Sequence, residues 1–185
     1  MIDSEAKPAA NDFGVRQMWR VTIAAPIETV WNTIVKTDEV LPFVFGAVCE
    51  TESGLKPGKP IRMVSADGKY AVAVGEVLEF DPPYRYSHTI SFTQVTGERP
   101  ARTTYELREV PGGTEVTLMS DAVPGTRMGK MVAGGPFIVE NLKKLIETGK
   151  PAFSGAMVLA LAPVMGLMTP KISRIENWPL GRVRA

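Results

Sequence analysis

Short turns between consecutive strands are the feature that most restricts the fold of this 185-residue chain. Asp67-Gly68 is typical of a two-residue hairpin turn, because its central positions tolerate positive φ angles. Asp81-Pro82-Pro83 cannot continue a hydrogen-bonded ladder, and Pro111-Gly112-Gly113 turns the chain back. Strands joined by connections this short pair antiparallel. The sequence therefore predicts an antiparallel meander between residues 47 and 122.

Alternation along the later strands predicts that one face of this sheet is apolar. Side chains two residues apart in a strand point to the same side of the sheet. The residues expected to face inward are Tyr84, Tyr86, His88, Ile90, Phe92, Thr103, Tyr105, Leu107, Val116, Leu118 and Ser120. His88, the single histidine of the chain, is thus expected on the apolar side.

Helical spacing occurs on both sides of the meander. After a strand over residues 17–24, Pro26 suits the first position of a helix whose apolar face is Ile27, Val30, Trp31 and Ile34. A second short helix or turn is expected in residues 38–46. The last helix, residues 136–149, carries an apolar stripe that matches the dry face of the sheet: Ile138, Val139, Leu142, Leu145 and Ile146. We expect this helix to cover the sheet, and Gly149 to end it.

Charge and composition exclude several classes of function. The 21 basic and 20 acidic residues give a net charge of +1, which offers no basic surface for nucleic acid. Cys49 is the single cysteine and His88 the single histidine, so neither an internal disulfide nor a zinc cluster can form. No nucleophile and base stand at a meaningful spacing. We therefore expect no catalytic residue, no metal and no cofactor.

Two phrases of the sequence carry a family resemblance: APIETVW at residues 25–31 and GEVLEFDPPYRYSHTI at residues 75–90. Over residues 17–149 the chain resembles the START-like (SRPBCC) superfamily, in particular the branch named after the activator of the heat-shock ATPase. The resemblance implies an α+β helix-grip fold. In this fold a curved antiparallel sheet of about seven strands, with two short helices after the first strand, wraps a long C-terminal helix and leaves a cavity between them.

That cavity implies a function in binding a hydrophobic small molecule or lipid-like ligand. The residues expected to contact the ligand are Phe43, Phe45, Met63, Tyr86, His88, Ile90, Tyr105, Leu118 and Phe137. One alternative is an enzyme resembling the polyketide cyclases, with His88 and Tyr105 as its acid and base. Another is a chaperone-regulating interaction module.

Two extensions flank the expected domain at residues 16–149. Residues 1–15 are expected to form a disordered tail without the pattern of a signal peptide, which favours a cytoplasmic protein. Residues 150–185 form a hydrophobic extension, with no charged side chain from Pro151 to Pro170. This run is long enough to reach across a membrane, but Gly155, Pro163 and Gly166 interrupt it. Packing on its own domain, homodimerisation and membrane contact remain open.

Overall fold

A computed structural model describes residues 13–152 and 169–180 of the chain. Its centre is an eight-stranded antiparallel sheet in the order β1-β8-β7-β6-β5-β4-β3-β2. β1 and β8, the first and last strands along the chain, therefore lie side by side. The strands are β1 (Val15–Ile23), β2 (Val40–Leu41), β3 (Ala47–Thr51), β4 (Pro60–Val64), β5 (Ala71–Asp81), β6 (Arg85–Phe92), β7 (Ala101–Val110) and β8 (Gly113–Ala122).

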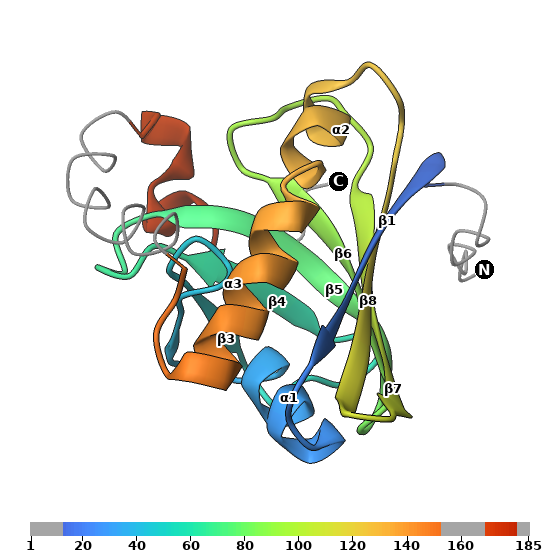
Figure 1. Cartoon of the computed structure of the whole chain (residues 1–185). Helices are drawn as coiled ribbons and strands as arrows, with labels where there is room; N and C mark the ends of the chain where they lie inside the picture. Colours follow the sequence, from blue (N-terminus) through green and yellow to red (C-terminus); the bar gives the residue numbers. More distant parts are fainter. Residues whose placement is uncertain (1–12, 153–168, 181–185) are drawn as a thin grey trace, which may run out of the picture.

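The sheet curls around the helix α3 (Gly135–Thr148), as Figure 1 shows. Part of the curvature arises between β5 and β6, where the register shifts between Val77 and Glu79. Such a bulge bends the strand that carries it. Close by, Gly75 lets the two strands approach, because a Cβ atom there would lie 1.9 Å from the carbonyl oxygen of Thr89. The curled sheet has a concave face, on which α3 lies.

Helix α3 is held on this face by both of its sides. At its start, Gly135 lies against the ring of Trp19, which a Cβ atom would approach to 2.0 Å. Its apolar side buries Val139 and Leu142. On its polar side, Glu147 accepts a hydrogen bond of 2.9 Å from the backbone N–H of Ala24. Gly149 ends the helix in the left-handed region at φ 72°, as the sequence predicts.

The main core lies between the concave face, α3 and α1 (Ile27–Ile34). Its innermost side chains are fully shielded, with 0% of the surface exposed for Ile23, Val30, Val116, Leu118 and Leu142. Each contributes roughly 1.5–3 kcal/mol when buried. A second, smaller cluster joins α2 (Arg127–Val132) to the far end of the sheet. The two clusters occupy different ends of the same face.

The helix-grip architecture is confirmed, with two corrections to its details. The sheet has eight strands rather than about seven, because residues 40–41 pair with β3. Of the helix or turn expected in residues 38–46, the structure has the turn, so the second short helix that the resemblance implies is absent. Residues 42–46 form a turn, in which the backbone N–H groups of Val44 and Gly46 both donate to the carbonyl oxygen of Leu41. Phe45 has a φ of 54° there, which an α-helix does not allow.

Helix α2 was not predicted from the sequence, although its start carries a recognisable cap. The Thr126 hydroxyl accepts a hydrogen bond from the N–H of Gly129. The Glu98 carboxylate accepts from the N–H groups of Arg127 and Met128, at 3.1 and 2.8 Å. A carboxylate that arrives from a distant loop is invisible to an analysis of local spacing.

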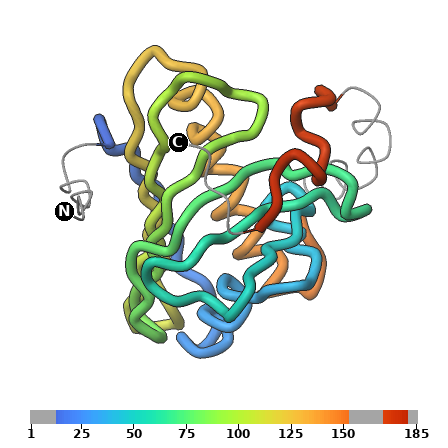
Figure 2. Tube along the Cα trace, turned by 180° about the vertical axis from the view of Figure 1, so that it is seen from behind, coloured from blue at the N-terminus to red at the C-terminus, as the bar shows by residue number. Residues whose placement is uncertain are grey.

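Residues 169–180 return to the sheet and contain the short helices η1 (Lys171–Ser173) and η2 (Ile175–Asn177). Both views show this segment beside the β4–β5 hairpin (Figures 1 and 2). Ser173 is buried and accepts a 2.8 Å hydrogen bond from Thr93. The carbonyl oxygen of Trp178 accepts a 2.6 Å hydrogen bond from Arg62.

The burial of the uncharged run stays a prediction, because residues 153–168 lie outside the described part of the chain. Residues 1–12 of the expected disordered tail also lie outside it. Among the described residues, no helix is long and apolar enough to cross a membrane. At the other end of the domain, Phe13 is already buried beneath Arg102, whose guanidinium lies 5.0 Å from its ring centroid.

The close approach of β5 and β6 predicts that Gly75→Ala is strongly destabilising. The added methyl group would overlap the Thr89 carbonyl, so one strand must move. We expect the free energy of unfolding in urea to fall by about 2 kcal/mol or more. Gly134→Ala is the control, because its Cβ would first meet the Phe45 ring at 3.3 Å. Equal losses in the two variants would contradict this account.

Candidate ligand-binding site

Two rows of side chains cross the concave face where β6, β7 and β8 lie side by side. In one row, Tyr86 pairs with Tyr105, and Tyr105 pairs with Leu118. In the next row, His88 pairs with Thr103, and Thr103 pairs with Ser120. We call His88, Thr103 and Ser120 the polar row, and Tyr86 with Tyr105 the tyrosine pair. The structure thus brings together Tyr86, His88, Tyr105 and Leu118, as the sequence predicts for one face.

Thr103 and Ser120 are absent from the predicted ligand contacts, although both were expected to face inward. The signal that could have found them is their register. Thr103 is a polar residue at an inward position of β7, directly beside His88 in β6. Ser120 holds the equivalent position in β8, one strand further. Such residues are normally placed by packing, so only their pairing with His88 distinguishes them.

The residues of both rows are buried, and four of their hydroxyl groups lack a hydrogen-bond partner among the described residues. The exposed fraction is 8% for His88 and Thr103, 5% for Tyr105, and 4% for Tyr86 and Ser120. Within the described part of the chain, the hydroxyls of Tyr86, Tyr105, Thr103 and Ser120 form no hydrogen bond with another protein group. Their oxygen atoms are not completely shielded, so a water molecule or a ligand can reach them. Buried hydroxyls in proteins almost always have a partner, because losing one costs about 1–3 kcal/mol. Four of them on one face are typical of a site that receives a partner from outside.

His88 is neutral and its tautomer is determined by a backbone contact. Burial lowers its pKa below the ordinary value of 6.5, an effect that the hydrogen bond with the Thr89 carbonyl opposes. Nδ1 lies 2.9 Å from that carbonyl oxygen. A carbonyl oxygen accepts hydrogen bonds and cannot donate them, so Nδ1 must carry the proton. The lone pair of the imidazole is then on Nε2.

The remaining titratable groups of the face are also uncharged. Burial, together with Cys49 and Tyr105, raises the pKa of Tyr86 well above its ordinary value. Burial and Cys49 likewise raise the pKa of Tyr105. The pKa of the Cys49 thiol is raised to about 12, first by burial and then by the charges of Asp38 and Glu50. Cys49 is therefore a protonated thiol at neutral pH and a poor nucleophile.

The buried carboxylate of Asp121 lies on the opposite face of the sheet. It receives hydrogen bonds of 2.8 Å from both Arg16 and Arg102. Although burial acts against it, these guanidinium groups keep the pKa of Asp121 below its ordinary value. Among the described residues, no group of three His, Cys, Asp or Glu side chains is arranged to hold a metal ion.

Apolar side chains border the polar row on both sides. Trp31, Phe80 and Tyr86 belong to or pack on the main core, with centroid distances of 5.4 Å for Trp31–Phe80 and 6.0 Å for Phe80–Tyr86. Beyond the polar row, Ile90 packs on the second cluster with Ala101 and Met128. The site is thus a band of neutral hydrogen-bonding groups in an otherwise apolar interior.

The other predicted contact residues lie at the edge of this region or in the core. Phe45 is 47% exposed, and its ring stacks on that of Phe137 at 4.3 Å. Phe43 is 1% exposed and part of the main core, against which Met63 packs half-buried. Whether these four contact a ligand stays a prediction.

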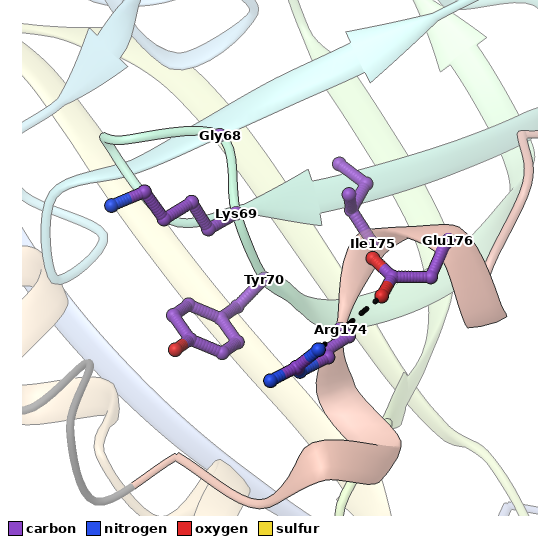
Figure 3. Close-up of a pocket in the computed structure, with 6 residues that line it drawn as sticks. All are labelled: Gly68, Lys69, Tyr70, Arg174, Ile175 and Glu176. Carbon is purple, nitrogen blue, oxygen red and sulfur yellow. Dashed lines mark ion pairs between the residues drawn. The ribbon is translucent and has the colours of Figure 1, made fainter.

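A separate pocket of about 340 Å³ lies between the β4–β5 hairpin and η2. It is lined by Gly68, Lys69, Tyr70, Arg174, Ile175 and Glu176 (Figure 3). Arg174 and Glu176 form an ion pair of 3.8 Å with both side chains more than half exposed, and Lys69 points away from them. The N–H of Ile175 donates to the Lys69 carbonyl at 3.0 Å. This pocket lies where residues 169–180 contact the β4–β5 hairpin.

Residues 24–147 match the family described as "Activator of Hsp90 ATPase homolog 1-like protein". The match covers more than half of the chain. The chain belongs to this family. Its SRPBCC-type, helix-grip fold agrees with a ligand-binding domain.

Solved structures of the same fold share little sequence with this member of the family. An Hsp90 activator from Plasmodium falciparum is 18% identical over 75% of this chain and 99% of its own, with a TM-score of 0.55. CalU16 from Micromonospora echinospora is 17% identical over 83% of this chain and 86% of its own, with a TM-score of 0.56. DynU16, from the dynemicin biosynthetic locus, is 23% identical over 74% of this chain and 48% of its own, with a TM-score of 0.58. These likenesses show the fold alone. No curated protein matches the chain in sequence.

The neutral state of His88 predicts a pH dependence of folding for this family member. Its pKa is lower in the folded chain than in the unfolded chain, where it has the ordinary value of 6.5. The unfolded state therefore binds the proton first as the pH falls. The contribution of neutral His88 to the stability of the fold is complete above pH 6.5, and it is lost as the pH drops toward the pKa of His88 in the folded chain.

The His88→Gln variant tests this dependence, because glutamine does not titrate. Between about pH 7 and pH 5, we expect its free energy of unfolding in urea to fall less than that of the wild type. Carboxylates titrate in both proteins and cancel in the comparison. Parallel pH profiles for the two proteins would show that His88 is not kept neutral by the fold.

Proposed function

We propose that this domain binds a hydrophobic, uncharged small molecule on the concave face of its sheet, against the polar row and the tyrosine pair. The observation that carries the proposal is that four buried residues of one face carry hydroxyls without a hydrogen-bond partner in the described chain. A ligand that satisfies them recovers part of the desolvation cost of these groups. Membership of a family with ligand-binding SRPBCC domains supports the same function.

The chemistry of the site favours binding over proton transfer. An enzyme with His88 and Tyr105 as acid and base needs a group that changes its charge near neutral pH. Burial moves both groups away from that range, since it lowers the pKa of His88 and raises that of Tyr105. The two residues also belong to different rows of the face. Hydrogen bonding in neutral form is the role that suits both.

For the extension at residues 150–185, we propose packing on its own domain. The buried contact between Ser173 and Thr93 supports this, as does the hydrogen bond from Arg62 to the Trp178 carbonyl. Arg62 also forms a 2.6 Å ion pair with Glu50. These contacts connect residues 169–180 to β3, β4 and the end of β6.

Buried hydroxyls with and without partners predict opposite mutational effects. Tyr105→Phe removes a hydroxyl that bonds no protein group in the described chain, so we expect the free energy of unfolding to change by less than about 0.5 kcal/mol. Thr93→Val is the matched control. Its hydroxyl lies 2.6 Å from the Ala71 carbonyl and 2.8 Å from Ser173, and its loss should cost about 1–3 kcal/mol. A large loss in Tyr105→Phe would mean that its hydroxyl serves the fold.

Ligand binding itself is expected to raise the melting temperature. At a hundred times its dissociation constant, a ligand adds about 2.7 kcal/mol of stability, or about 5–10 °C for a chain of this size. A panel of neutral sterols, aromatic polycycles and fatty alcohols can be screened by thermal melting. Thr103→Leu adds a larger side chain to the polar row and should reduce the rise in melting temperature that the ligand causes. Thr104 faces the other side of β7, so Thr104→Leu should keep that rise. If no compound raises the melting temperature, the proposed function fails.

A further inference from the structure

The one group of the site with a single hydrogen-bonding role is Nε2 of His88. The side chain is more than nine-tenths buried, and its Nδ1–H is engaged by the Thr89 carbonyl at 2.9 Å. Nε2 therefore presents a lone pair that can accept a hydrogen bond and cannot donate one. Thr103 lies opposite His88 in the register, yet no hydrogen bond joins the two side chains within the described residues.

The hydroxyls around His88 impose no such requirement. The tyrosine pair, Thr103 and Ser120 each carry an O–H that rotates, so each can donate to a carbonyl or accept from a hydroxyl. These groups tolerate many arrangements of polar atoms on a ligand. His88 alone demands a donor, because a ligand without one would cover Nε2 and leave its lone pair unsatisfied.

Charge narrows the class of ligand further. Among the described residues, the buried carboxylate of Asp121 is on the outer face, held by Arg16 and Arg102. The side chains of the two rows are neutral. An anionic ligand would therefore lose its hydration without gaining a cation, which is costly in an apolar interior.

The ring contacts around Tyr86 indicate that the apolar part of the ligand is aromatic. Tyr86 lies between three other rings, with centroid distances of 5.1 Å to His88, 6.0 Å to Phe80 and 6.3 Å to Tyr105. The Tyr86 and Tyr105 rings are nearly parallel, at 7°. Aromatic side chains pack well against further aromatic rings in offset or edge-on geometry.

Building on the proposed function, we propose that His88 selects neutral aromatic ligands that carry a hydroxyl group, by accepting a hydrogen bond from that hydroxyl at Nε2. The tyrosine pair and the polar-row hydroxyls then satisfy the other oxygen atoms of the ligand. Fatty acids and other free carboxylates are excluded.

Three naphthalenes of similar size separate these requirements. 2-Naphthol has a hydroxyl donor, 2-methoxynaphthalene has the same oxygen without a donor, and 2-naphthoate has a negative charge. We expect the wild-type protein to bind 2-naphthol about tenfold more tightly than 2-methoxynaphthalene, the effect of about one buried hydrogen bond. Binding of 2-naphthoate should be weaker than that of 2-naphthol by tenfold or more. Isothermal titration calorimetry measures all three affinities.

His88→Phe keeps an aromatic ring and removes the acceptor. In this variant the affinity for 2-naphthol should fall to that for 2-methoxynaphthalene, so that the ratio of the two approaches one. Ser87→Ala is the control, because Ser87 is the preceding residue in β6 and bonds Thr104 on the other face at 2.8 Å. It should keep the tenfold ratio. If His88→Phe does not fold, His88→Leu removes the acceptor with a smaller side chain.

The outcomes distinguish the inference from the function on which it rests. Equal wild-type affinities for 2-naphthol and 2-methoxynaphthalene, or a ratio that survives the loss of the imidazole, would overturn the role of His88 while leaving ligand binding intact. Tight binding of 2-naphthoate would overturn the exclusion of anions. Failure of all three compounds to bind would overturn the inference, and the proposed function fails with it when the melting panel shows no binding either.

Discussion

The packing of α3 against the concave face of the sheet is the contact on which the rest of the structure depends. Gly135 allows the start of the helix to approach Trp19, and Leu142 fills the centre of the core. With α1, α2 and α3 in place, most of the inward-facing side chains of β6, β7 and β8 are buried. Most of these side chains are apolar and stabilise the fold by their burial. The same geometry forces five polar side chains into the interior: Tyr86, His88, Thr103, Tyr105 and Ser120.

Polar groups in an interior oppose folding unless they find partners, so these five residues need a reason other than stability. Several other buried polar groups of the described chain do have partners. Thr93 bonds Ala71 and Ser173, Ser87 bonds Thr104, and Asp121 bonds two arginines. The contrast is confined to one face and to groups that carry no charge. A neutral ligand with oxygen atoms resolves it, whereas a charged one would add a second cost.

Much of this arrangement follows from the sequence, because alternation with a period of two determines which side chains share a face. Tyr86, His88, Tyr105 and Leu118 were predicted to face inward for that reason, and Gly149 was predicted to end the last helix. The pairing of His88 with Thr103 was not predictable, since it depends on the connection between β6 and β7. Nor could the sequence decide between a short helix and a turn in residues 38–46, where a φ of 54° at Phe45 excludes the helix. The tautomer of His88 depends on a carbonyl position that only the folded backbone supplies.

The state of His88 is the most direct test of this account, and His88 is the single histidine of the chain. Nitrogen-15 NMR of the imidazole therefore reports one residue without assignment by mutation. At neutral pH and without ligand, the account predicts a neutral ring with a protonated Nδ1 and a bare Nε2, and a ligand carrying a hydroxyl should shift the Nε2 signal far more than that of Nδ1. A protonated ring, a proton on Nε2, or an Nε2 signal that no such ligand moves would contradict it.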